Sequence, residues 1–171
     1  MYLADSFIIA ARVSTTLTQE DTYEVEVCLR PFTPQDVQQR QQEVLSRIEI
    51  LAEAGSVDPT VFWWSPKVCP PGRDNPLSAG CPAIVAELIE LAEKEGFSLE
   101  PFIREHAGVR PGEDDSLVLP VICLVVRDHG TIGGLYPVAL DDTKYTVEDG
   151  LNALEAGEDV LNIAHQYAQS R

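Results

Sequence analysis

Apolar and polar residues alternate over residues 22–30, TYEVEVCLR, near the N-terminal end of the chain. The apolar positions on one side of this run are Tyr23, Val25, Val27 and Leu29. Alternation with a period of two is typical of a strand with one covered face. Residues 6–13, SFIIAARV, form another β-rich run, and the polar STTLTQED separates the two. We therefore expect a hairpin or two successive strands in this part of the chain.

Apolar residues then recur at helical spacing between residues 34 and 54. They are Val37, Val44, Ile48 and Leu51, with Leu45 and Ala52 beside them. Thr33 offers an N-cap oxygen, Pro34 suits the first helical position, and Asp36 stands three residues after the cap. Gly55 supplies a stop signal. These signals predict a helix over residues 34–54.

A strand signal follows this helix. After the turn GSVDP, the run TVFWW at residues 60–64 is β-branched and aromatic, and Pro66 ends it. Strand, helix and strand in this order predict a crossover unit, which should be right-handed if its two strands are parallel. Residues 67–81, KVCPPGRDNPLSAGC, contain several proline and glycine turn signals. We expect this segment to be an irregular loop, the longest in the chain.

The next segments predict a helix and two strands. Pro82 suits the start of a helix that Gly96 ends, and residues 97–115 form a connection. LVLPVICLVVR at 117–127 and TIGGLYPVAL at 131–140 predict two strands joined by the tight turn DHG. Because residues 121–126 are all apolar, the first of these strands is expected to be central and buried on both faces.

A short final helix completes the predicted fold. Thr146, with Asp149 three residues later, predicts its N-cap. The element order β-β-α-β-α-β-β-α indicates an α/β protein with a mixed β-sheet and packed helices. The 171 residues have the length of one domain, 1–171, in which residues 1–5 and 158–171 are expected to be loosely ordered. No apolar run is long enough to span a membrane.

The charge composition of the chain indicates the kind of solvent in which the protein works. The chain has 28 acidic against 12 basic residues, a formal net charge of -16, and only three lysines. Dispersed acid with scarce lysine favours a halophilic cytoplasm, where salt screens the repulsion within about 3 Å at 1 M. The alternative is an ordinary acidic protein. The N-terminus carries Asp5 where a signal peptide would be basic, so we expect a cytoplasmic location.

Four segments carry a resemblance to a known family. They are RIEILAEAGSVDPTVFWWSPKV at 47–68, GCPAIVAELIELAEKEGFSLEPF at 80–102, LVLPVICLVV at 117–126 and LYPVALDDTKYTVEDGLNALEAG at 135–157. The chain resembles small acidic haloarchaeal proteins labelled helix-turn-helix domain proteins, over about residues 22–157. The resemblance implies a role in gene regulation and supplies no catalytic residues.

A DNA-binding role is an alternative that the physical chemistry disfavours. A helix-turn-helix joins two helices by a short turn, whereas the helix predicted at 34–54 is followed by a strand. A net charge of -16 also opposes binding to phosphates. If DNA is bound, the candidate contacts are Arg30, Arg40 and Arg47, because the last two lie on one face of that helix.

The common cofactor and hydrolase motifs are absent from the sequence, so it favours a non-enzymatic protein and no cofactor is expected. The alternative is a zinc or thiol site at Cys69 and Cys81, completed by His106, His129 or another cysteine. Free thiols in a loop would explain the pair equally. The groups Arg104–His106 and Asp128–His129 offer acid and base, but such neighbours are common in solvated turns and no nucleophile accompanies them.

The two tryptophans, Trp63 and Trp64, are consecutive in the strand predicted at 60–64. Consecutive strand residues face opposite sides, so the two cannot enter the same core layer. One would anchor the sheet; the other is either covered as well or forms a binding surface with Lys67 and Arg73 of the next loop. Our leading hypothesis is a non-enzymatic cytoplasmic protein of a halophile that acts in a regulatory setting through protein contacts or a small ligand, on the Trp64 side of the sheet. A protein partner or a homo-oligomer is expected.

Overall fold

A computed structural model describes residues 22–70, 81–109 and 115–163. Its centre is a four-stranded sheet in the order β2-β1-β6-β7. The strands are β1 (Tyr23–Leu29), β2 (Val57–Trp63), β6 (Ile122–Asp128) and β7 (Thr131–Tyr136). β1 and β2 are parallel, and the other neighbours are antiparallel. The predicted crossover and hairpin are thus confirmed, whereas the strand expected at 6–13 lies outside the described residues.

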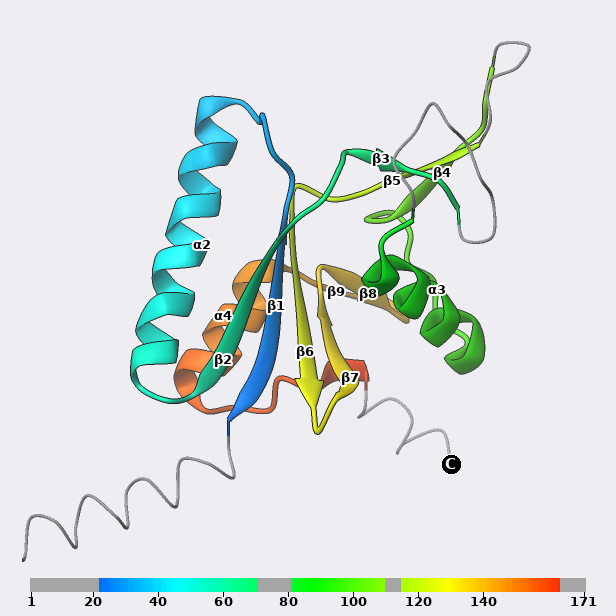
Figure 1. Cartoon of the computed structure of the whole chain (residues 1–171). Helices are drawn as coiled ribbons and strands as arrows, with labels where there is room; N and C mark the ends of the chain where they lie inside the picture. Colours follow the sequence, from blue (N-terminus) through cyan, green and yellow to red (C-terminus); the bar gives the residue numbers. More distant parts are fainter. Residues whose placement is uncertain (1–21, 71–80, 110–114, 164–171) are drawn as a thin grey trace, which may run out of the picture.

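Helices cover both faces of this sheet, which gives three layers (Figure 1). The helix α2 (Gln35–Glu53) joins β1 to β2 and lies beside α4 (Val147–Ala156) on one face. The helix α3 (Ala83–Glu95) lies on the opposite face. This arrangement confirms the predicted α/β fold with a mixed sheet. No helix of the described residues is both long and apolar enough to cross a membrane.

Short strands complete the layer around α3, and only some of them lie within the strands that the sequence predicted. β3 (Lys67–Val68), β4 (Arg104–His106) and β5 (Ser116–Val118) form a small sheet in the order β3-β5-β4. β8 (Val138–Leu140) and β9 (Thr143–Tyr145) form a hairpin. Their buried residues share one core cluster with α3. The loop expected at 67–81 therefore begins with a strand, and its residues 71–80 lie outside the described residues.

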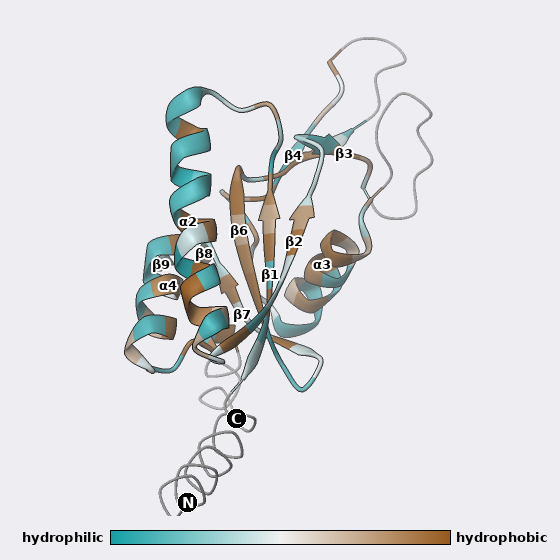
Figure 2. Cartoon of the chain, turned by 60° about the vertical axis from the view of Figure 1, so that its left-hand side comes forward, coloured by the Kyte–Doolittle hydropathy of each residue, from teal (hydrophilic) through white to brown (hydrophobic). Residues whose placement is uncertain are grey.

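Two hydrophobic clusters lie on either side of the sheet. Val25, Val27 and Leu29 of β1 pack with α2 and α4, while Cys28 packs toward α3. Residues 122–126 of β6 are all buried, as predicted for a central strand. In Figure 2 the hydrophobic colour of β1 and β6 contrasts with the largely hydrophilic α2. The period-two pattern of β1 thus predicted its two faces correctly.

Local signals at the turns and caps are mostly confirmed. In α4, the Asp149 N–H donates to Thr146 Oγ1 at 3.1 Å, and the Thr146 N–H donates to Asp149 Oδ2 at 2.7 Å. His129 and Gly130 form the predicted tight hairpin turn with positive φ at both positions. The cap predicted for α2 is wrong. Thr33 is buried and its hydroxyl is directed at Gln41, so α2 begins after Pro34 without a side-chain cap.

Several predicted boundaries also change. β2 begins at Val57, so the expected turn at 55–59 is partly strand; Pro59 is tolerated because β2 is an edge strand. The strands expected at 117–127 and 131–140 are each divided in two around Pro120 and Pro137.

The start of the expected loose C-terminal segment is packed onto the sheet. Val160 and Ile163 are buried, and Asn162 donates to and accepts from the backbone of Leu135 at 2.9 and 3.0 Å. The backbone of this segment passes so close to β7 that a Cβ at Gly134 would lie 2.5 Å from the Val160 carbonyl oxygen. Close approach of another backbone segment is a common reason for a glycine inside a strand.

Candidate functional site

The outer edge of β2 exposes apolar side chains. β2 is the terminal strand of its sheet among the described residues, and its last three residues are Val61, Phe62 and Trp63. Their exposed fractions are 44%, 42% and 55%. Exposed strand edges offer unpaired backbone groups to other chains, and natural proteins usually protect them with charge. Here the edge is uncharged from Thr60 to Trp63.

Hydrogen bonds determine which backbone groups of β2 point outward. The Tyr23 N–H donates to the Ser56 carbonyl at 3.2 Å, and the Trp64 N–H donates to the Leu29 carbonyl at 2.9 Å. In a parallel ladder, alternate residues bond to the same neighbour. The even-numbered residues therefore face β1, whereas Val61 and Trp63 direct their N–H and C=O groups away from the sheet.

A fully exposed aromatic residue stands near this edge. Phe32, in the loop between β1 and α2, is 100% exposed and has a φ of 56°. The loop is held by two glutamines: Gln41 Nε2 donates to the Arg30 carbonyl at 3.0 Å, and Gln38 Nε2 donates to the Thr33 carbonyl at 2.9 Å. Gln41 also donates to the Val121 carbonyl at 2.9 Å, which ties the loop to the segment before β6. Phe32 is thus presented to solvent by a loop with its own hydrogen bonds.

An open hollow of about 940 Å³ lies between Phe32, the first turns of α2 and Trp63. The described side chains that line it are mostly uncharged, and Glu43 is the only ionisable one among them. The polar ones include Gln35, Gln38, Gln39 and Gln42. Apolar aromatic groups rimmed by amides are a composition found at protein interfaces, where aromatic residues are enriched and carboxylates are depleted.

One of the two tryptophans is buried and the other is exposed. Trp64 is only 2% exposed, and its Nε1 donates to the Pro120 carbonyl at 3.0 Å. The surface predicted on the Trp64 side is therefore wrong, because Trp64 follows the end of β2 and belongs to the core cluster of α3. The exposed tryptophan is Trp63. Lys67 is exposed at the start of β3, and Arg73 lies outside the described residues. The apolar surface formed by Phe32, Val61, Phe62 and Trp63 is hereafter called the β2-edge surface.

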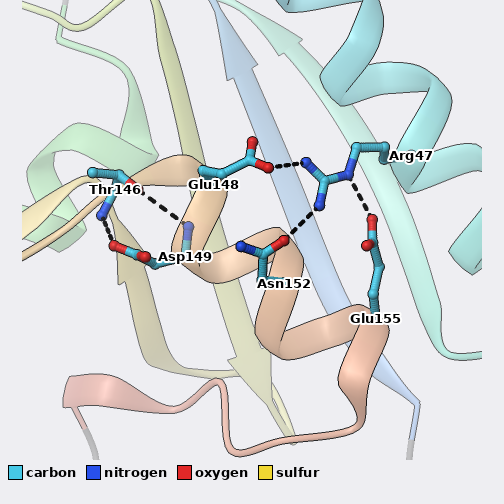
Figure 3. A network of polar contacts seen from close by, with 6 residues as sticks. All are labelled: Arg47, Thr146, Glu148, Asp149, Asn152 and Glu155. Atoms are coloured by element: carbon cyan, nitrogen blue, oxygen red, sulfur yellow. Dashed lines mark hydrogen bonds and ion pairs between the residues drawn. The ribbon is translucent and has the colours of Figure 1, made fainter.

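The candidate DNA contacts are largely occupied by the protein itself. Arg47 donates to Glu148 at 2.6 Å, to Glu155 at 2.6 Å and to Asn152 at 2.9 Å, and all three belong to α4 (Figure 3). Arg30 is half-buried and donates to the Leu119 carbonyl, and burial lowers its pKa. Arg40 is exposed on α2. Arg30 and Arg47 are therefore engaged by other residues of the protein, whereas Arg40 is exposed and lines the same surface hollow as Arg47.

A second arginine network, which the sequence analysis did not identify, joins the sheet to α3. Arg127 at the end of β6 donates to Glu26 of β1 at 2.7 Å and to both carboxylate oxygens of Glu87 at 2.7 Å. These bonds raise the pKa of Arg127 and lower that of Glu87. A bidentate pair of this kind fixes orientation. The sequence signal was limited to the position of Arg127 directly after the apolar run 121–126, since Glu26 lies in the middle of its alternating strand.

The four cysteines lie as two pairs of neighbouring thiols. Cys28 and Cys123 stand opposite each other on β1 and β6 and are buried, and burial raises the pKa of Cys28 to about 12. Cys69 is buried and Cys81 is half-buried. The pKa of Cys81 is raised mainly by burial and, to a smaller extent, by the electrostatic interaction with Cys69. The second pair is thus close enough for its charges to interact.

Among the described residues, no third metal ligand is grouped with Cys69 and Cys81. Within residues 22–70, 81–109 and 115–163, no three His, Cys, Asp or Glu side chains are grouped so that they could hold a metal ion. His106 lies on the exposed strand β4, and His129 is in the exposed hairpin turn, 3.5 Å from its neighbour Asp128.

The fold and surface described above are those of a small α/β domain with an exposed sheet edge. The family described as "Helix-turn-helix domain" matches residues 17–159. Since this match covers most of the 171 residues, the chain belongs to that family. Neither a curated protein nor a solved structure matches the chain.

The described part of the chain does not contain two helices joined by a short turn. β2 and β3 separate α2 from α3, and β4 to β9 separate α3 from α4. α2 and α4 do pack against each other, through the Arg47 network, but they are far apart in sequence. The sequence expectation that a strand follows the helix at 34–54 is therefore confirmed.

Proposed function

We propose that this protein is a non-enzymatic regulatory protein that acts through protein contacts made by the β2-edge surface. The observation that carries the proposal is the outward-facing, uncharged edge of β2, with Val61, Phe62 and Trp63 about half exposed and Phe32 fully exposed. Addition of a strand to a sheet edge is a common mode of protein recognition, with backbone hydrogen bonds and alternate side chains contributing together. Membership of the helix-turn-helix family supports the regulatory setting.

Site-specific photo-crosslinking tests the proposal. A photoreactive phenylalanine analogue in place of Trp63 is expected to give a discrete protein adduct in cells, because this side chain projects from the edge. The matched control has the same analogue in place of Glu93, which is exposed on α3 on the opposite face of the sheet. Phe32→Ala should weaken the adduct at position 63. No discrete adduct at position 63, or equal adducts at both positions, would contradict the proposal.

DNA binding is the second candidate, and membership of the helix-turn-helix family favours it. Among Arg30, Arg40 and Arg47, Arg40 is the exposed one, so it is the contact that a duplex could use most directly. If DNA is the ligand, affinity should fall with a steep logarithmic dependence on salt, and Arg40→Ala should reduce that slope by about 1. Lys94→Ala on α3 is the control. Unchanged retention of duplex DNA by both variants would contradict this candidate.

We also propose that the protein works in a concentrated salt solution. Eight basic and many more acidic residues lie in the described part, and two of the basic residues, Arg47 and Arg127, are already held by four carboxylates in all. The remaining acidic charge is self-repulsive at low ionic strength and is screened at molar salt. The thermal midpoint should therefore rise from low to molar potassium chloride. A midpoint that is independent of salt would contradict the proposal.

A further inference from the structure

We infer that the occupant of the β2-edge surface is a second copy of the chain, whose β2 pairs antiparallel with the first about a twofold axis at Phe62. Such pairing would join the two four-stranded sheets into one continuous sheet. The inference rests on the proposed function, because it requires that the β2 edge binds protein. It adds the identity of the partner and the register of the contact.

The backbone groups of this edge are complementary to themselves. Val61 and Trp63 both direct their N–H and C=O groups outward, as the bonds of Tyr23 and Trp64 to the neighbouring strand require. When Phe62 faces Phe62 of the other copy, Val61 faces Trp63 of the other copy on each side of the axis. Residues opposed in this way exchange two backbone hydrogen bonds per pair in an antiparallel ladder. The twofold axis therefore satisfies all four outward N–H and C=O groups of Val61 and Trp63 in each copy.

Pro59 selects this register over the next one. A register shifted toward the start of β2 would place Val61 opposite Val61 and Pro59 opposite Trp63. Proline has no N–H, so one hydrogen bond of each such pair would be lost. A register shifted the other way runs beyond Trp63, which is the last residue of β2. The axis at Phe62 is the register that the unpaired groups support.

The side chains are arranged to suit the same axis. Phe62 is the neighbour of Cys28 in β1 and lies on the α3 face, whereas Val61 and Trp63 neighbour Val27 and Leu29 on the α2 face. Phe62 would occupy the non-hydrogen-bonded position on the axis, where opposed Cα atoms are only about 4.5 Å apart. Two aromatic rings would meet there, and Val61 would pack against Trp63 of the other copy on the opposite face.

Charge supports a second copy at this face. Each copy carries a formal net charge of -16, so two copies repel wherever their acidic surfaces meet. The edge from Thr60 to Trp63 has no ionisable side chain, and the adjoining hollow beside α2 is lined mainly by glutamines. An uncharged, apolar contact keeps the acidic surfaces of the two copies apart, so their electrostatic repulsion is smallest there. A twofold contact is also the commonest way in which identical chains associate.

Sedimentation equilibrium of the full chain in molar potassium chloride tests the association. The expected mass is twice the 18.8 kDa of one chain. Phe62→Lys places two like charges on the axis and should raise the dissociation constant at least 100-fold. Ile50→Lys is the control, because Ile50 is another exposed apolar residue, 65% exposed on α2, outside the edge. Circular dichroism shows whether each variant is folded. A folded parent chain that is monomeric at all concentrations would overturn the inference.

Disulfide trapping tests the register. In a Cys81→Ser background, Phe62→Cys should form an interchain disulfide under mild oxidation, because opposed Cα atoms at the axis lie within the range of about 4.4–6.8 Å that a disulfide spans. Asp58→Cys, four residues away on the same strand, should not. Equal trapping at both positions would overturn the axis at Phe62. If the analogue at position 63 crosslinks to a different protein while the chain stays monomeric, the inference of a second copy is wrong and the proposed function stands.

Discussion

The guanidinium of Arg47 on α2 lies 2.6 Å from the carboxylate of Glu155 on α4. A second carboxylate, that of Glu148, lies at the same distance from it, so one cation serves two anions of the facing helix. These contacts raise the pKa of Arg47 and lower that of Glu155. In a chain with few basic residues, this arginine is used to join two helices.

Replacement of Arg47 should therefore weaken the packing of α2 on α4. We expect Arg47→Ala to lower the free energy of unfolding by about 1–2 kcal/mol, since partly exposed pairs contribute about 0.2–1 kcal/mol each and a network somewhat more. The measurement is chemical unfolding at high and low salt, and the loss should be smaller at high salt. Arg40→Ala, an exposed position on the same helix, should change stability by less than about 0.5 kcal/mol. Equal losses in the two variants would contradict the structural role.

The Arg127 network predicts how stability depends on pH. Arg127 donates to Glu87 and holds the pKa of that carboxyl below its ordinary value of 4.5. A lowered pKa in the folded state contributes stability above the unfolded value, and this contribution is lost as the pH falls through the folded value. The free energy of unfolding should therefore decrease as the pH falls below about 4.5. Glu87→Gln should show a shallower decrease, measured by urea unfolding across this range.

The control for this experiment is Glu90→Gln, on the exposed face of the same helix. It should keep the slope of the parent protein. A Glu87→Gln variant with the parent slope would show that the network does not contribute to the acid dependence.

Close packing of β7 against residues 158–163 predicts different results at two adjacent glycines. A Cβ at Gly134 would lie 2.5 Å from the Val160 backbone oxygen, which is fixed, so Gly134→Ala should cost about 1–3 kcal/mol. A Cβ at Gly133 would meet the end of the Leu161 side chain at 3.0 Å, which is able to move. Gly133→Ala should cost less. Thermal unfolding of both variants measures the difference, and the reverse order would contradict the packing.

Thiol reactivity tests the zinc alternative. We expect one thiol, that of the half-buried Cys81, to react in the native protein, and four to react after unfolding. Cys28 and Cys123 should stay unreactive in the native state, because burial raises the pKa of both and removes them from solvent. Zinc should be present in less than stoichiometric amount. Stoichiometric zinc that Cys69→Ser and Cys81→Ser both remove would establish the metal site.

Local patterns in the sequence predicted much of the fold. The alternation in β1, the turn at His129 and Gly130, and the cap formed by Thr146 and Asp149 were all predicted correctly. Each depends on residues within a few positions of one another, and the backbone preferences that produce them act over that range. The cap predicted at Thr33 failed because this threonine is buried and directed at Gln41, a contact that its neighbours in sequence do not reveal.

The candidate site depended on contacts between distant residues. The sequence by itself determined that Trp63 and Trp64 could not share one core layer, since consecutive strand residues face opposite sides. Only the tertiary structure decided that β2 is the edge strand, that Trp64 is buried beneath the Pro120 segment, and that Trp63 is exposed. It also decided that Arg47 binds residues more than 100 positions away. Strand order and ion pairing depend on which segments, distant in sequence, pack against each other. Short-range periodicity does not predict these long-range contacts.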